Sequence, residues 1–317
     1  MGAVLPLFPP IASTYARQED LLFYFLVAVT LFFVLLIFGS IFFFAVRYRR
    51  RTPDERAQPT RPNLPLEVAW IVIPLVIALV IFVWGAKLFF VAMRPPAQAV
   101  EVTVVGKQWM WKIQHADGTR EINALHIPVG TPIKLILTSE DVIHDFFVPA
   151  FRIKRDVVPG RYTTAWFEAT TPGTYHLFCA QYCGTNHAAM IGSVVVMEPA
   201  DYERWVRART SPVLPASAGA VLFQRLGCSS CHQTNTNAKA PALAGLFGQQ
   251  VTLADSRQVT ADMDFLRDHI LTPGKTPVAG YPQIMPTYQG QVSEEQILEL
   301  IAYVRSLARA ERSQGGS

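Results

Sequence analysis

Charged side chains are scarce in this sequence. Only 16% of the 317 residues are Asp, Glu, Lys or Arg, whereas 50% are hydrophobic, a balance that leans toward membrane proteins. Residues 21–46 carry no charge at all, and residues 68–93 carry only Lys87, near the end of the stretch. Each stretch is long enough to cross a hydrocarbon core of about 30 Å. We therefore predict two transmembrane spans, at about 21–46 and 68–93, rather than two buried helices of a soluble protein.

An excess of positive charge is confined to the N-terminal third. Residues 1–96 hold 9 basic and 5 acidic residues, whereas residues 97–209 hold 11 of each and residues 210–317 hold 8 of each. Six arginines lie between the two predicted spans: Arg47, Arg49, Arg50, Arg51, Arg56 and Arg61. By the positive-inside rule, this loop is cytoplasmic and everything after the second span lies outside, on the periplasmic side of a bacterial cell membrane. The balanced charge elsewhere gives no support for nucleic-acid binding.

Beyond the second span, the long apolar stretches give way to short alternating or β-branched runs separated by turn signals. These runs predict seven strands of a β-sandwich or barrel: 100–105, 121–127, 133–138, 142–148, 163–167, 174–178 and 191–196. A Pro- and Ser-containing stretch, 210–217, then precedes a helical C-terminal third. We predict three units: 1–96 with the membrane hairpin, 97–209 with the sandwich, and 210–317 with a linker, a helical domain and a tail.

Cysteine is rare, and the first two of its four copies belong to a ligand-rich loop. Cys179, Cys183, His187 and Met190 follow a predicted strand. A mononuclear blue-copper site takes Cys, His and a weak Met from such a loop and a second His from an earlier strand. A second cysteine lets two thiolates bridge two copper ions, and His144 is placed to be the remote histidine. The two alternatives are a disulfide between Cys179 and Cys183 and a zinc site. A disulfide would leave His187 and Met190 unexplained. A zinc site would not explain Met190, because methionine is a poor zinc ligand.

The other two cysteines form a C-x-x-C-H signature. Cys228 and Cys231 precede His232, the pattern in which two thiols attach haem c covalently and the histidine binds its iron. A thioredoxin-like redox pair would not explain the adjacent histidine. The second axial ligand must come from the distal side, where Met285 lies in a Pro-flanked loop. Met263 is the other candidate in this region.

Two helices are predicted to frame the C-terminal domain, at 218–226 and 294–309. Ser293 and Gln296 form a plausible capping box at the start of the second helix. These two helices, and a close crossing at Gly219 on the first of them, are what the resemblance of residues 216–309 to a small class I cytochrome c implies.

Over its first 200 residues, the sequence resembles subunit II of cytochrome c oxidase. The resemblance is carried by Gly106-Lys-Gln-Trp-Met-Trp111, Asp141-Val-Ile-His144, Asp156-Val-Val-Pro-Gly-Arg161 and the loop from Cys179 to Met190. Residues 216–309 resemble a small class I cytochrome c, as in the caa-type haem-copper oxidases. The resemblance implies a multi-domain membrane protein with a two-helix hairpin, a cupredoxin-like β-sandwich or barrel and an all-α cytochrome c domain.

The resemblance also implies particular ligands. The binuclear copper A centre would have six: the bridging thiolates of Cys179 and Cys183, the side chains of His144, His187 and Met190, and the backbone carbonyl of Gln181. Haem c would be held by Cys228 and Cys231, with His232 and Met285 as axial ligands. Many family members have a glutamate in place of Gln181 that also binds magnesium shared with subunit I. A neutral amide weakens the case for magnesium here.

Two further residues acquire roles through the resemblance. Trp109 would receive the electron from the donor before it reaches copper, and Glu67 would be the entrance of a proton-uptake channel toward subunit I. Without the resemblance, the first is an ordinary packed aromatic residue and the second an interfacial charge.

The function that the resemblance implies is electron relay in a terminal oxidase. Electrons would pass through haem c to copper A and then to subunit I, which holds haems and copper B and reduces oxygen to water while protons are pumped. Expected partners are subunit I, subunit III, the lipid membrane and an external donor such as cytochrome c or a bc-type complex. The alternatives are the equivalent subunit of a nitric oxide reductase and a stand-alone membrane-anchored electron carrier.

Overall fold

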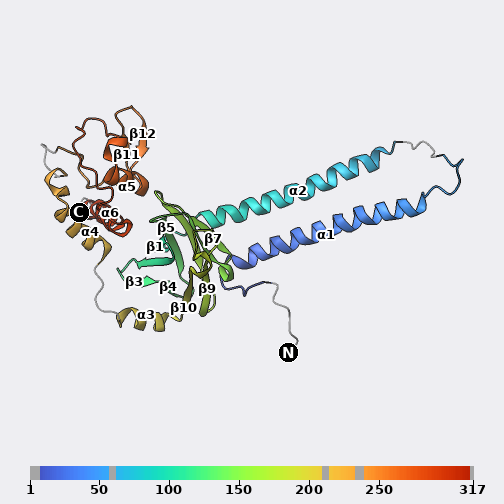
Figure 1. Cartoon of the computed structure of the whole chain (residues 1–317), viewed down its shortest axis with the longest axis horizontal. Helices are drawn as coiled ribbons and strands as arrows, with labels where there is room; N and C mark the ends of the chain where they lie inside the picture. Colours follow the sequence, from blue (N-terminus) through green and yellow to red (C-terminus); the bar gives the residue numbers. More distant parts are fainter. Residues whose placement is uncertain (1–7, 57–61, 209–213, 233–238, 315–317) are drawn as a thin grey trace.

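A computed structural model describes residues 8–56, 62–208, 214–232 and 239–314, the last seven of these by backbone alone. Arg61 of the predicted cytoplasmic loop and residues 210–213 of the predicted linker lie outside these ranges. Two long helices leave one side of a central β-domain, and a smaller C-terminal domain lies on its other side (Figure 1). This order of units agrees with the predicted fold class of a two-helix hairpin, a β-sandwich and a helical domain.

The two long helices are α1 (Ala16–Arg47) and α2 (Leu64–Met93), which lie side by side with Phe25 and Trp84 in contact (Figure 1). Their most apolar windows have mean hydropathies of 3.0 and 2.8 and are 0% buried, so both helices are long and apolar enough to cross a membrane. Each begins before the predicted span. The start of α2 is set by Asn63, whose side chain caps the backbone N–H of Leu66.

The membrane helices are fixed to the β-domain by polar contacts at its surface. Arg152 donates two hydrogen bonds to the carboxylate of Asp20 in α1, at 2.8 and 2.9 Å, and both side chains are nearly buried. The indole N–H of Trp166 donates to the carbonyl of Val91 in α2 at 2.8 Å. These contacts connect both helices to the part of the chain that carries the candidate ligands.

The β-domain is a sandwich of two five-stranded sheets, with strand orders β3-β2-β1-β5-β8 and β4-β10-β9-β6-β7. Its strands are β1 Val100–Lys107, β2 Met110–His115, β3 Arg120–Ile122, β4 Ala124–Pro128, β5 Pro132–Ser139, β6 His144–Val148, β7 Ile153–Val157, β8 Thr163–Glu168, β9 Gly173–Cys179 and β10 Ile191–Met197. The inward-facing side chains of both sheets form one core, and Cys179, Cys183 and Met190 belong to its edge. The predicted sandwich is therefore confirmed, with the ligand-rich loop packed onto its core.

Three differences separate the predicted strands from the observed ones. Strands β2 and β7 were not predicted, although β2 alternates in burial and places Trp111 and Ile113 in the core. The single strand predicted over 121–127 is two strands, because Asn123 has φ +56°, a left-handed conformation that asparagine tolerates better than most residues. The break sends β3 into the first sheet and β4 into the second.

The C-terminal domain follows a short helix, α3 (Pro199–Arg207). It consists of α4 Pro215–Arg225, the hairpin strands β11 Gln250–Thr252 and β12 Gln258–Thr260, α5 Met263–Leu271 and α6 Glu294–Gln314. Helices α4 and α6 confirm the two predicted helices, whereas α3, α5 and the hairpin were not predicted.

The predicted packing of α4 and α6 is also confirmed. The capping box is present, with Ser293 N–H donating to Gln296 Oε1 at 3.0 Å and Gln296 N–H donating to Ser293 Oγ at 3.4 Å. A Cβ on Gly219 would lie 1.9 Å from the Glu299 carbonyl oxygen. The crossing of the two helices therefore needs glycine at this position.

Candidate copper and haem sites

The ligand-rich loop connects β9 to β10. Cys179 ends β9, and its N–H donates to the carbonyl of Met190 at 3.1 Å, which closes the base of the loop. The sulfurs of Cys179 and Cys183 are 3.8 Å apart, and both thiols are free. The loop thus presents two unbonded sulfurs side by side.

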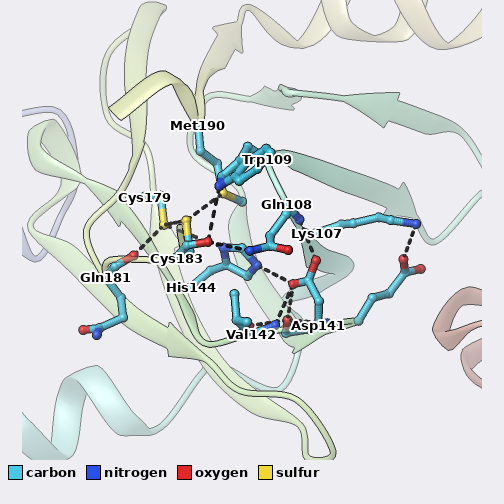
Figure 2. A network of polar contacts seen from close by, with 12 residues as sticks. Lys107, Gln108, Trp109, Asp141, Val142, His144, Cys179, Gln181, Cys183 and Met190 are labelled. Atoms are coloured by element: carbon cyan, nitrogen blue, oxygen red, sulfur yellow. Dashed lines mark hydrogen bonds and ion pairs between the residues drawn. The ribbon is translucent and has the colours of Figure 1, made fainter. Parts of the chain in front are cut away.

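The predicted copper ligands converge on these two sulfurs, and Figure 2 labels all of them except His187. The Nδ1 atom of His144, from β6, lies 3.9 Å from Cys179 Sγ, and the Gln181 carbonyl oxygen lies 3.2 Å from the same sulfur. Around Cys183 Sγ, His187 Nδ1 is at 3.5 Å and Met190 Sδ at 3.9 Å. All six donor groups named from the sequence are therefore brought together. The Gln181 side chain turns away from the sulfurs.

The thiols of Cys179 and Cys183 are both buried, but their pKa values are shifted in opposite directions. Cys183 is 3% exposed, and His144 and Met190 are 0% exposed. Burial raises the pKa of Cys179, but hydrogen bonds with His144 and with the surrounding backbone outweigh it and lower the pKa to about 6. Burial and the neighbouring Cys179 raise the pKa of Cys183 to about 12. A bound cation would favour the second thiolate, and two soft sulfurs with two imidazoles and a thioether suit copper.

A carboxylate that the sequence prediction missed orients His144. The Nε2 atom of His144 donates to Asp141 Oδ1 at 2.8 Å, which leaves Nδ1 facing Cys179. The backbone N–H of Gln108 donates to the other oxygen of Asp141 at 2.7 Å. Gly106 lets the ring fit, because a Cβ there would lie 2.9 Å from His144 Cδ2. The signal in the sequence was the carboxylate three residues before the histidine.

Trp109 lies in the turn between β1 and β2 and touches the ligand-rich loop. Its indole N–H donates to the carbonyl of Cys183 at 3.3 Å, and Gln108 Nε2 donates to the same oxygen at 2.8 Å. Gly184 has φ +115° and a Cβ there would meet Gln108 Nε2 at 3.0 Å, so glycine lets both side chains close over the loop. Trp109 is thus in direct contact with the backbone of a candidate ligand.

Glu67 lies in helix α2 and belongs to neither candidate site. It is in the first turn of α2, at the end of the helix remote from the β-domain (Figure 1). The structure therefore separates this residue from both candidate metal sites, and its role in proton uptake stays a prediction.

The C-terminal domain contains a cavity of about 460 Å³. It is lined by the C-x-x-C-H residues Cys228, Cys231 and His232, by Met285, and by apolar side chains that include Leu300 and Val304 of α6. A large apolar cavity with two thiols and an imidazole at its wall fits a covalently attached haem.

The two methionines considered as the second axial ligand, Met285 and Met263, lie in different places. Met285 lines the cavity, whereas Met263 packs against an apolar cluster that includes Leu266 and Ile297. His232 Nδ1 donates to the Pro241 carbonyl at 2.9 Å, which leaves Nε2 available for iron.

A second histidine also lines the cavity but offers no free nitrogen. The ring nitrogens of His269 lie 2.9 Å from the Phe265 carbonyl oxygen and 2.7 Å from the Thr276 carbonyl oxygen. His232 and Met285 therefore remain the pair of side chains suited to the two faces of a haem.

Comparisons with known proteins match both halves of the chain outside the membrane helices. Residues 118–198 match the family described as "Cytochrome C oxidase subunit II, periplasmic domain", and residues 216–308 match the family "Cytochrome c". Cytochrome c oxidase subunit 2 of Thermostichus vulcanus is 32% identical over 268 residues, which cover 66% of this chain and 82% of the relative.

Two further proteins extend the comparison. Cytochrome c oxidase subunit 2 of Alkalihalophilus pseudofirmus is 30% identical, with 86% of this chain and 82% of the relative covered. The crystal structure of the periplasmic domain of subunit II of cytochrome oxidase from Bradyrhizobium japonicum is 30% identical over 36% of this chain and 96% of that domain, with a TM-score of 0.35. The chain therefore belongs to the cytochrome c oxidase subunit II family, as a member with two apolar N-terminal helices, a cupredoxin-like sandwich and a fused cytochrome c domain.

Proposed function

We propose that this chain relays electrons one at a time from an external donor through its own haem c to a binuclear copper A centre and on to subunit I. Subunit I would use them to reduce oxygen to water while protons are pumped. The observation that carries the proposal is the gathering of four further donor groups around two free sulfurs, in a chain that also holds a haem-sized cavity with a C-x-x-C-H motif.

At the copper site, Cys179 and Cys183 would bridge the metals. His144 and Met190 would complete one coordination sphere, and His187 with the Gln181 carbonyl would complete the other. Two copper ions bridged by thiolates supply one-electron chemistry in which the charge is shared by both metals. The protein contributes a rigid support, because His144 is fixed by Asp141 and the loop is closed between β9 and β10.

Around the haem, Cys228 and Cys231 would provide the thioether bonds, and His232 and Met285 would bind the iron. Methionine and histidine together favour a relatively high reduction potential, which suits a carrier placed between a respiratory donor and an oxidase. Trp109 would receive electrons destined for copper, since its indole contacts the Cys183 carbonyl. Magnesium is no part of the proposal, because Gln181 offers a neutral amide that turns away from the site.

The proposed placement in the cell follows from the helices and the arginines. Helices α1 and α2 would span a bacterial membrane, with the arginine-rich connection in the cytoplasm and both metal-binding domains on the periplasmic side. Subunit I would be the main partner, with subunit III beside it. Cytochrome c or a bc-type complex would be the external donor.

The proposed role of Glu67 leads to the first prediction. In the purified complex, Glu67→Gln is expected to slow oxygen consumption severalfold while leaving the copper and haem c spectra unchanged, because the variant removes a proton acceptor remote from both sites. Oxygen uptake with a reduced donor measures the effect. Full turnover at every pH would assign Glu67 to the helix boundary only, and reduction of nitric oxide in place of oxygen would overturn the assignment to a terminal oxidase.

A further inference from the structure

The C-terminal domain rests on the β-domain through ion pairs made by α6. Glu295 pairs with Lys112 of β2 at 2.7 Å, and Glu299 pairs with Arg120 of β3. Arg305, one turn and a half further along the same helix, pairs with Glu101 of β1 at 3.0 Å. The three contacts are made by three neighbouring strands of one sheet, β3, β2 and β1, so they define a continuous face, which we call the docking face.

A tyrosine from the β-domain reinforces this face. Tyr162, just before β8, packs against an apolar cluster of the C-terminal domain that contains Leu266, Ile297 and Ile301. Its backbone N–H donates to Asp264 Oδ1 at 2.8 Å. Burial raises the pKa of its hydroxyl. One aromatic side chain of the β-domain is thus inserted into the other domain.

The charges of the docking face are partly desolvated and fully paired. Burial raises the pKa of Glu295, but hydrogen bonds with Lys112 and with its surroundings outweigh it and lower the pKa to about 2. The cationic partners keep contact with solvent, because the side chains of Lys112, Arg120 and Arg305 are 25%, 61% and 29% exposed, so added salt weakens these pairs. Three such pairs, one hydrogen bond and one aromatic contact suit a reversible contact between domains better than a permanent one.

The haem cavity lies on the opposite side of α6. Leu300 and Val304 line the cavity, whereas Glu295 and Glu299 face the β-domain. At 3.6 residues per turn, the nine positions from Glu295 to Val304 turn the helix by about 180°. The thickness of α6, roughly 10 Å with its side chains, therefore lies between the docking face and the cavity.

We propose that the docking face is a resting position for the cytochrome c domain, a proposal that rests on the electron relay described above. In this position α6 separates the haem cavity from the β-domain, and the cavity is turned outward, where an external donor reaches it. The domain then leaves the docking face while still tethered to β10 and α3, and it presents its haem to the copper site. The residues around the cavity would hold a haem that gives up one electron on becoming ferric, and the ligands around Cys179 and Cys183 would hold the copper pair that accepts the same electron. The tether keeps the undocked domain at an effective concentration of order millimolar.

The test uses the full chain in its oxidase complex, with the double variant Glu295→Gln and Glu299→Gln. Hydrogen exchange at the amides of β2 and β3 reports docking without any need for activity, and it should become faster in the variant. Transfer from flash-reduced haem c to copper should rise roughly fivefold, because two weak ion pairs no longer hold the resting position. Added salt should increase the rate of transfer from haem c to copper in the unaltered protein, and it should change this rate less in the variant.

Two further variants make the test specific. Tyr162→Ala weakens docking from the β-domain side and should act in the same direction. Asp255→Asn removes an exposed pair with Arg257 in the loop between β11 and β12, away from the docking face, and should change neither measurement.

Several outcomes would overturn the proposal. Slower transfer in the double variant would mean that the docked position is the productive one. If neither the hydrogen exchange of β2 and β3 nor the rate of transfer from haem c to copper changes in the double variant, the C-terminal domain does not dock on this face. If copper is never reduced by haem c in any form of the protein, the relay itself fails, and the exchange data alone decide whether the domains dock.

Discussion

Replacing Cys183 with serine is expected to abolish the binuclear copper site and to stop electron delivery to subunit I. The Cys183 sulfur is the common neighbour of Cys179, His187 and Met190 in the structure. Serine offers a hard oxygen that ionises far less readily than a thiol, so it cannot bridge two soft metal ions. The unaltered chain should bind two coppers, and the variant should lose its near-infrared and EPR signature with its copper.

The matched control for this variant is Asp141→Asn. Asparagine keeps the size of the side chain and can still accept a hydrogen bond from His144, but it removes the negative charge. Loss of an orienting partner typically lowers metal affinity about 10- to 100-fold. This variant should therefore retain both coppers at saturating metal, with weaker affinity by titration. A single copper or stoichiometric zinc in the unaltered chain, or two coppers in Cys183→Ser, would contradict the binuclear assignment.

The second large effect is expected at the haem. Met285→Ala should eliminate the methionine-to-iron charge-transfer band near the red end of the visible spectrum and lower the reduction potential, because the thioether stabilises the ferrous state. Met263→Ala is the natural comparison, since Met263 packs in an apolar cluster and does not line the cavity. It should leave the band intact and reduce stability by less than the about 2–5 kcal/mol typical of a fully buried methionine, because Met263 is only partly buried. Loss of the band in Met263→Ala instead would reverse the choice of ligand.

The candidate ligands could be predicted because their chemistry is local. Cys179, Cys183, His187 and Met190 lie within one loop, and C-x-x-C-H is a contiguous signature. The apolar spans were equally clear, although the start of α2 depends on capping by Asn63, which hydropathy does not detect. The remote ligand, His144, was assigned from its place on an earlier predicted strand, and the resemblance to subunit II then supplied the Gln181 carbonyl.

The features that were missed depend on contacts between distant residues or on single backbone conformations. The break at Asn123 is one left-handed residue inside a continuous β-branched pattern. Asp141 becomes an orienting residue only when the turn before β2 brings Gln108 beside it. The docking face joins Lys112 to Glu295, 183 positions apart, and the regional charge balance of 11 against 11 and 8 against 8 gave no sign of it. Net charge averages over a surface, whereas docking depends on a few local pairs.

The relay is tested most directly by the rate at which haem c reduces copper in the intact chain. After flash reduction of haem c, copper reduction should follow first-order kinetics with a rate independent of protein concentration, because both sites belong to one polypeptide. Truncation after Thr210 should leave the copper spectrum intact and make copper reduction depend on added cytochrome c. A rate in the intact chain that increases in proportion to protein concentration would show that haem c serves another acceptor, and it would contradict the proposed order of transfer.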